Sequence, residues 1–258
     1  MTQNNDKTAP LSLSDIAAAL GLLSRLSIPV DTDRAMQRGA LASWAYPIAG
    51  LALALIAGAV TQIALLLVLP ATLAAALTLA TLIIATGAMH EDGLADSADG
   101  LWGGWDKEHR LKIMKDSHIG TYGVLALALS LLLRWSAYTV IIDHGMLWPA
   151  ILTSAMVSRA VMVPIMATLP HARTEGLSHS VGRPTMQTAY IALAIAAVAS
   201  LVLVQFWAVW LVAACAISTL GCIAIAKSKI EGQTGDILGA TQQLTEITAL
   251  LTLAALLT

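Results

Sequence analysis

Charged side chains are scarce in this sequence. Asp, Glu, Lys and Arg make up 12% of its 258 residues, whereas 57% are hydrophobic and the mean hydropathy is +0.76. A soluble domain of this length carries roughly twice as much charge. Several apolar runs reach the roughly 20 residues that cross a bilayer. The lack of charge therefore excludes an ordinary soluble domain and predicts an all-α, polytopic transmembrane helical bundle.

Cysteine is also nearly absent. Cys215 and Cys222 lie in one apolar run, so we interpret them as membrane-buried thiols rather than as a disulfide or a metal-binding pair. No pattern typical of nucleic-acid binding and no internal repeat occurs. The first ten residues are polar and do not resemble a cleavable signal peptide. We expect residues 1–10 to be disordered and residues 11–258 to form a single integral-membrane domain.

The apolar segments predict about seven spans and one shorter helix. Residues 11–28 carry apolar side chains at helical spacing and predict an interfacial or re-entrant helix, with Ser12 and Asp15 as a capping box. The spans are expected near residues 44–69, 71–89, 120–142, 147–169, 187–205, 207–226 and 237–257.

The basic residues predict the orientation of these spans. With the N-terminus in the cytoplasm and seven alternating spans, twelve of the fourteen Lys and Arg residues lie on the cytoplasmic side. The other two, Arg134 and Arg159, fall within spans. Every polar cluster then lies at the cytoplasmic face.

The acidic residues are concentrated in one stretch. Seven of the sixteen lie in residues 90–119, directly after an apolar segment. In a helix, Asp92, Asp96 and Asp99 would project from one face. Carboxylates crowded in this way repel one another, and a hard divalent cation stabilises them, with Mg²⁺ favoured because the ligands are oxygens. His90 could serve as a base, a hydrogen-bond donor or a structural residue at the helix end. A solvated acidic loop is the alternative.

Three residues further along could assist this site. Asp116 precedes the next span and could cap that helix or fold back as a further metal ligand. Lys112 and Lys115 are candidate phosphate contacts, although a basic cytoplasmic flank alone would also place lysines here.

Two other polar segments are predicted at the same face. Residues 227–239 combine glycines with Lys229, Thr234 and Asp236 just before the last span, a pattern typical of either a phosphate-binding helix N-terminus or an ordinary turn capped by Asp236. Arg173, in an earlier loop, could bind phosphate through two hydrogen bonds or simply anchor the loop at the membrane surface.

Three ionisable residues fall within predicted spans. Such groups normally face a partner or a polar cavity because charge in hydrocarbon is costly. We expect Arg159 to line a cavity and Glu246 to pair with an arginine, whereas Arg134 could extend outward beside Trp135.

A carboxylate–metal site with basic residues around it is suited to transfer chemistry on a diphosphate. CDP-alcohol phosphotransferases and prenyltransferases also carry aspartates at helical spacing, but their signatures differ from the Asp-Gly-x-x-Asp-x-x-Asp-Gly order found here. An ion-coupled transporter using Arg134, Arg159 and Glu246 is the alternative from another class. Transporters commonly show inverted repeats and a polar site at the midplane, and neither is predicted here.

Several segments closely resemble the cobalamin synthase family, whose members are adenosylcobinamide-GDP ribazoletransferases. The resemblance departs at Glu91, where an apolar residue is expected. The matching segments are residues 90–101, 113–123 and 25–29, Tyr46-Pro47 with Gly50, Ser158-Arg159, Ala172-Arg173 with Glu175-Gly176, and residues 232–236 with Gly239 and Glu246.

The resemblance implies a Mg²⁺-dependent, multi-pass enzyme of the bacterial inner membrane with a cytoplasmic active face. It would join adenosylcobinamide-GDP to α-ribazole or α-ribazole 5′-phosphate, giving adenosylcobalamin or its 5′-phosphate and GMP, and could act as an oligomer. The implied site places Mg²⁺ on Asp92, Asp96 and Asp99, the catalytic base at His90 or Asp116, and substrate contacts at Lys112, Lys115, Arg159, Arg173, Lys229, Thr234 and Asp236.

Overall fold

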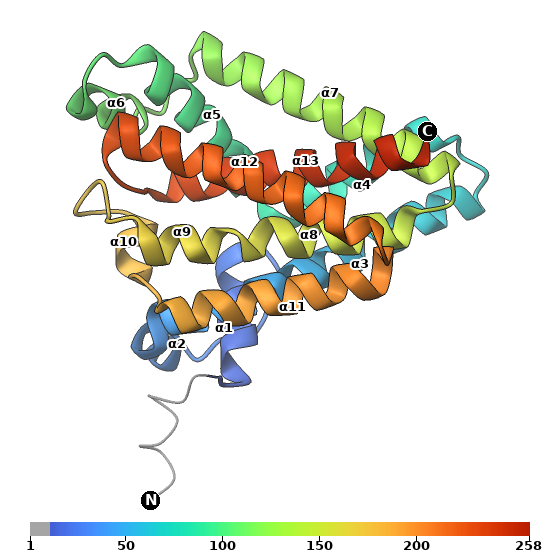
Figure 1. The fold of residues 1–258 in the computed structure, drawn as a ribbon, viewed down its shortest axis with the longest axis horizontal. Helices are drawn as coiled ribbons and strands as arrows, with labels where there is room; N and C mark the ends of the chain where they lie inside the picture. Colours follow the sequence, from blue (N-terminus) through green and yellow to red (C-terminus); the bar gives the residue numbers. More distant parts are fainter. Residues whose placement is uncertain (1–10) are drawn as a thin grey trace, which may run out of the picture.

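The computed structural model describes residues 11–258, which form helices joined by short links (Figure 1). The disorder expected for residues 1–10 lies outside the described residues. The elements are α1 (Ser14–Leu23), α2 (Thr32–Arg38), the 3₁₀ helix η1 (Gly39–Ala45), α3 (Tyr46–Leu66), α4 (Ala71–Thr86), α5 (Met89–Gly103), α6 (Lys107–Ile113), α7 (Thr121–Asp143), α8 (Leu147–Ala160), α9 (Met162–Thr168), α10 (Leu177–Val181), α11 (Met186–Val204), α12 (Trp207–Ile230) and α13 (Gly235–Leu257).

Five helical stretches are long and apolar enough to cross a membrane. The first is the stretch of residues 32–66 that ends with α3, and the others are α7, the α8–α9 pair, α11 and α12. A sixth is added if α4 and α5, which are bent by 88° relative to each other, count as one span. The prediction of an all-α polytopic bundle is therefore confirmed, with five or six such segments instead of seven. The last predicted span, α13, is not among them because Gln242, Gln243 and Glu246 interrupt its apolar sequence. Most of α13 is buried by neighbouring helices, which explains how it carries these polar groups.

The two ends of the bundle differ in charge. At one end, the α3–α4, α7–α8 and α11–α12 links contain neither lysine nor arginine. The opposite end carries α6, α10, the loop 170–176 and the α12–α13 link (left in Figure 1). We call this second end the basic end, because Lys107, Lys115, Arg173 and Lys229 all lie there.

A buried aspartate fixes the N-terminal helix to the bundle. The Asp15 carboxylate accepts hydrogen bonds from Arg38 Nε at 2.8 Å and from Trp44 Nε1 at 2.7 Å. It also accepts the Ser12 backbone N–H at 3.2 Å, which is one half of the predicted capping box. Asp15 therefore holds α1 against α2 and η1, a role that the capping-box prediction did not include.

The acidic segment forms one continuous helix, α5, as predicted. Gly87 and Ala88 both adopt left-handed backbone conformations, with φ of 65° and 57°, and end α4. Glycine takes this conformation without strain, and two such residues in succession turn the chain sharply. With four acidic residues among its 15, α5 lies outside the five membrane-length apolar segments.

Two glycines allow α5 and α13 to cross with their backbones in contact. A Cβ atom on Gly93 would lie 2.9 Å from the Asp236 carbonyl oxygen and 3.2 Å from Gly239 Cα. Small residues at a helix crossing permit this close approach. The crossing places Asp92 and Asp96 beside the start of α13.

Replacing Gly93 with alanine is expected to separate α5 from α13. Overpacking of this kind costs about 1–3 kcal/mol, so the melting temperature in detergent should fall. Gly221→Ala is the matched control, because Gly221 lies on an exposed face of α12 with no atom within 4 Å of its added Cβ. Equal melting temperatures for the two variants would contradict the role of this crossing.

Candidate active-site cleft

A cleft opens at the basic end, where α5 and the start of α13 meet α9 and the loop 170–176. Aliphatic and thioether side chains form part of its wall, and polar side chains gather along the rest. The main lining residues are His90 and Asp92 from α5, Met162 and Met166 from α9, His171 and Arg173 from the loop, and Gln233, Thr234 and Asp236 from the start of α13.

Backbone pairing joins the two loops that form this cleft. The Ala172 N–H donates to the Gln233 carbonyl at 2.9 Å, and the Gln233 N–H donates to the Pro170 carbonyl at 2.8 Å. The Gln233 amide also contacts His171 Nδ1 at 2.9 Å and accepts the Ser178 hydroxyl at 2.6 Å. The prediction that the two loops share one face is confirmed, and they form a single hydrogen-bonded unit.

The start of α13 differs from the predicted turn. Thr234 is the N-cap, since its hydroxyl accepts the Ile237 N–H at 3.3 Å. Asp236 instead forms an ion pair with Arg173 and accepts the Thr234 hydroxyl at 3.2 Å. The alternative in which Asp236 caps the helix is therefore wrong, and Arg173 and Asp236 act as a pair within the cleft.

Carboxylates from α5 and α13 share one negative region. The pKa of Asp96 is raised to about 7, first by burial and then by the nearby charges of Asp92 and Asp236, against the opposing effect of Arg173. Carboxylates that disfavour one another's charge in this way form an oxygen donor set suited to a divalent cation. Among residues 11–258, no three His, Cys, Asp or Glu side chains form a group that could hold a metal ion. Magnesium binding by Asp92, Asp96 and Asp99 stays a prediction.

Asp99 makes a different set of contacts. Its two carboxylate oxygens accept the backbone N–H groups of Gly120 at 2.7 Å and Gly123 at 2.9 Å. A carboxylate at a helix N-terminus satisfies free N–H groups and interacts favourably with the helix dipole. Asp99 therefore fastens the start of α7 to α5, which is the helix-capping task that we had considered for Asp116.

Asp116 and Lys112 lie on the exposed surface and are not among the residues lining the cleft. Asp116 bonds His118 Nδ1 at 2.7 Å, and this hydrogen bond lowers the pKa of the carboxyl group. Neither proposed role of Asp116, as cap or as metal ligand, matches this position. The helix that it was expected to cap begins after Gly120.

The other two predicted lysines, Lys115 and Lys229, lie on different sides of α5. Lys115 forms an ion pair of 3.0 Å with Glu175, which lines the cleft. Lys229 Nζ lies 5.4 Å from the ring centroid of Trp102. Lys115 is therefore at the rim of the cleft, whereas Lys229 faces the other side of α5.

His90 connects the cleft to the interior of the bundle. It lines the cleft, yet only 1% of its surface is exposed. Burial, followed by the charges of Arg159 and Arg134, lowers the pKa of His90 and keeps the ring neutral.

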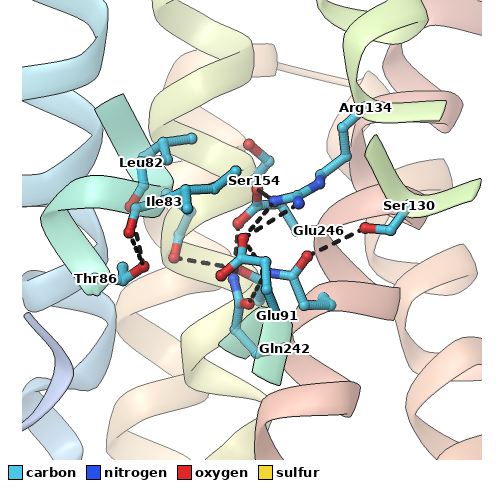
Figure 2. Close-up of polar contacts among 12 residues, drawn as sticks. Leu82, Ile83, Thr86, Glu91, Ser130, Arg134, Ser154, Gln242 and Glu246 are labelled. Carbon is cyan, nitrogen blue, oxygen red and sulfur yellow. Dashed lines mark hydrogen bonds and ion pairs between the residues drawn. The ribbon is translucent and has the colours of Figure 1, made fainter. Parts of the chain in front are cut away.

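Behind His90, four buried charges form a network among α5, α7, α8 and α13 (Figure 2). Both terminal nitrogens of Arg134 lie 3.2 Å from Glu91 Oε1, and its Nη1 lies 3.5 Å from Glu246 Oε1. Arg159 lies 4.0 Å from the other Glu246 oxygen. Gln242 and Gln243 donate further hydrogen bonds to Glu246 and Glu91.

The network tests three predictions that were made from the sequence. Glu246 pairs with arginine, as predicted. Arg134 does not extend outward, because its side chain is only 1% exposed and points toward Glu91 (Figure 2). Arg159 lies in the core and is not among the residues lining the cleft, so the substrate contact expected for it is not provided by this geometry. Two arginines and two glutamates leave the network neutral, which makes its burial tolerable.

Of the main lining residues named above, Met162, Met166, His171 and Gln233 were not predicted as site residues. Gln233 and His171 lie inside the two segments that we had singled out, so proximity to those motifs was an available signal. The methionines follow the ordinary apolar pattern of a span, and no sequence signal distinguishes them from core residues.

Replacing Arg134 with methionine is expected to destabilise the bundle. Glu91 would lose its partner in the core, and removing one member of a buried pair costs about 3–5 kcal/mol. The double variant Glu91→Gln/Arg134→Met should recover much of this loss, because it removes both charges. Thermal unfolding in detergent measures both, and additive losses would show that the pair does not interact.

The raised pKa of Asp96 predicts a pH-dependent stability. The folded protein holds a proton on this carboxyl group that the unfolded chain releases, so stability should fall as the pH rises from about 4 to about 7. Asp96→Asn, which cannot ionise, should therefore melt higher than the wild type at about pH 8 and show little difference at about pH 4.

The measurement is made without divalent cations, and Asp143→Asn at the far end of α7 is the matched control. An Asp96→Asn effect that is equal at both pH values would contradict the shared negative region.

The fold and the cleft together define the class of protein. It is an integral-membrane protein whose helical bundle has, at one end, a cleft that contains both acidic and basic side chains. A sequence profile described as cobalamin-5-phosphate synthase matches residues 15–254. The chain belongs to this family. No solved structure matches it at a significant level.

Among its relatives, the adenosylcobinamide-GDP ribazoletransferase of Bradyrhizobium diazoefficiens is 42% identical, covering 94% of each chain. The protein of the same name from Mesorhizobium japonicum is 40% identical over 93% of this chain and 92% of the relative. That from Rhizobium meliloti is also 40% identical, over 93% and 95%.

Proposed function

We propose that this chain is an adenosylcobinamide-GDP ribazoletransferase. It would join adenosylcobinamide-GDP to α-ribazole, or to α-ribazole 5′-phosphate, and release GMP. Relatives that carry this name are about 40% identical over nearly the whole chain, which supports the assignment. The observation that carries it is that Asp92, Asp236 and Arg173 line one cleft with Asp96 close beside them, because a diphosphate needs both a cation site and direct cationic contacts.

The reaction is a substitution at phosphorus. A ribazole hydroxyl oxygen forms a bond to the phosphorus on the cobinamide side, and the bond from that phosphorus to GMP breaks. Of the two predicted bases, only His90 lines the cleft, so we assign the acceptance of the hydroxyl proton to its neutral ring. Asp116 receives no role.

Arg173 and Thr234 are proposed to hold the diphosphate. Arg173 supplies planar N–H donors that match phosphate oxygens. Thr234 lies at the N-terminus of α13, where backbone N–H groups and the helix dipole favour an anion. Lys115 at the rim adds positive charge once it leaves Glu175.

Asp92, Asp96 and Asp236 are proposed to hold Mg²⁺ together with the phosphate oxygens of the substrate, because among the described residues these side chains alone do not form a metal-binding group. The ion would neutralise charge on the diphosphate and stabilise the leaving GMP. Asp236 takes the place first expected for Asp99, whose oxygens already accept two backbone N–H groups. The short distance in sequence between Asp236 and Thr234 brings the metal-binding and phosphate-binding groups together.

We further propose that the basic end faces the cytoplasm of a bacterial cell, in the inner membrane. The distribution of lysine and arginine supports this orientation. No observation favours the transporter alternative, because Arg134 and Arg159 both form ion pairs with Glu246 in the core.

The test is an assay of purified protein with adenosylcobinamide-GDP, α-ribazole and Mg²⁺. GMP and a cobalamin product should form in equal amounts, a chelator should stop the reaction, and added Mg²⁺ should restore it. Absence of GMP with the wild-type protein would reject the assignment.

Asp96→Asn should lower the rate at least about 100-fold, as loss of a preorganised charge commonly does. Asp143→Asn should retain wild-type activity, since Asp143 is exposed at the opposite end. Wild-type activity in Asp96→Asn would contradict the proposed metal site, but it would not contradict the assigned reaction.

A further inference from the structure

A second cavity, which we call the lateral slot, lies between α5, α7, α12 and α13. Its wall is almost entirely apolar. Leu94 and Leu101 of α5, Ala126 of α7, Ile225 of α12 and Leu244 of α13 are among its lining residues. None of the cleft residues described above lines it.

The slot is separated from the cleft by the α5–α13 crossing. At Gly93 and Gly239 the two backbones touch, which leaves no passage between the cavities. The apolar residues of α5 that line the slot lie on the helix face opposite Asp92 and Asp96. A substrate bound in the cleft therefore cannot extend through this crossing into the slot.

The slot opens among helices that face hydrocarbon. α7 and α12 are both membrane-length, and only 33% and 22% of their apolar windows are buried. Large apolar side chains on both helices are exposed, including Leu125 at 54% and Leu220 at 63%. An apolar cavity between such helices excludes water and admits hydrocarbon.

A charged and an amphipathic side chain lie together at one end of the slot. Trp102 lines it and is 52% exposed, and Lys229 Nζ lies 5.4 Å from the Trp102 ring centroid. Cys222, Ile225 and Lys229 follow one another along a single face of α12, so the slot runs from the charged end into the bundle. Tryptophan with lysine is a typical combination at the level of lipid headgroups.

One residue in the wall of the slot carries an unpaired hydroxyl. Ser97 lines the slot and is 3% exposed, and its hydroxyl makes no hydrogen bond within the described structure. The hydroxyl oxygen is itself enclosed by protein atoms, so the surface that the slot offers to an occupant is apolar.

We propose that the lateral slot binds one phospholipid of the surrounding bilayer. One acyl chain lies between α7, α12 and α13, and the anionic phosphate lies at Lys229 beside Trp102. The lipid packs behind α5, on the face opposite the carboxylates. This site is independent of the transferase reaction proposed for the cleft.

The test compares two tryptophan variants of α7. Ala126→Trp fills the slot, and Ala128→Trp places the same side chain on an exposed position of the same helix. Protein is purified in mild detergent, and bound phospholipid is counted by native mass spectrometry. Wild type and Ala128→Trp should each retain one phospholipid, and Ala126→Trp should retain at least tenfold less. Equal retention in all three would overturn the proposal.

A photoreactive-acyl phosphatidylglycerol tests the site in wild-type protein, without relying on a variant that must fold. Its crosslinks should map to residues 222–229 and 237–244, and crosslinks confined to outward-facing residues would contradict the slot. Phosphatidylglycerol should displace phosphatidylcholine, and Lys229→Gln should remove this preference while Lys229→Arg keeps it. Protection of the slot by α-ribazole, with no retained phospholipid, would assign it to substrate instead.

Discussion

The contact between α5 and α13 is the constraint on which the rest of this structure depends. Gly93 and Gly239 let the two backbones touch, and a side chain at Gly93 would meet the Asp236 backbone. On one side of the crossing, Asp92 and Asp236 form the acidic part of the cleft, and Asp96 lies close to both. On the other side, the same two helices line the lateral slot. One close approach therefore positions the proposed chemistry and separates it from the hydrocarbon-facing cavity.

The ion pairs in the core also depend on the contact between α5 and α13. Because α5 lies against α13, Glu91 and Glu246 are close enough for Arg134 of α7 to contact both. The family resemblance had led us to expect an apolar residue at the position of Glu91, where a lone carboxylate would be costly. The pairing with Arg134 explains how this chain accommodates the departure. The polar residues of α13 also explain why hydropathy does not identify it as a span, since its surroundings are other helices and not lipid.

The aspartates show how far sequence periodicity could predict the site. Helical spacing correctly placed Asp92, Asp96 and Asp99 near one another, but it did not predict a second role of Asp99. Asp99 holds the N-terminus of α7, because the α5–α6–α7 connection brings Gly120 and Gly123 to its carboxylate. Asp116 is adjacent to α7 in sequence yet lies on the exposed surface. Periodicity specifies the face of a helix, whereas the neighbour at that face depends on how distant segments fold.

The sequence by itself determined the helical membrane architecture, the concentration of basic residues at one end and the family. These properties depend on composition, spacing and local motifs, which can be read along the chain. Only the tertiary structure decided that Arg173 pairs with Asp236, that Arg134 and Arg159 lie in a buried network, and that Ser97 lines an apolar slot. Each of these depends on contacts between helices far apart in sequence, and such contacts are fixed by packing, as at Gly93 and Gly239.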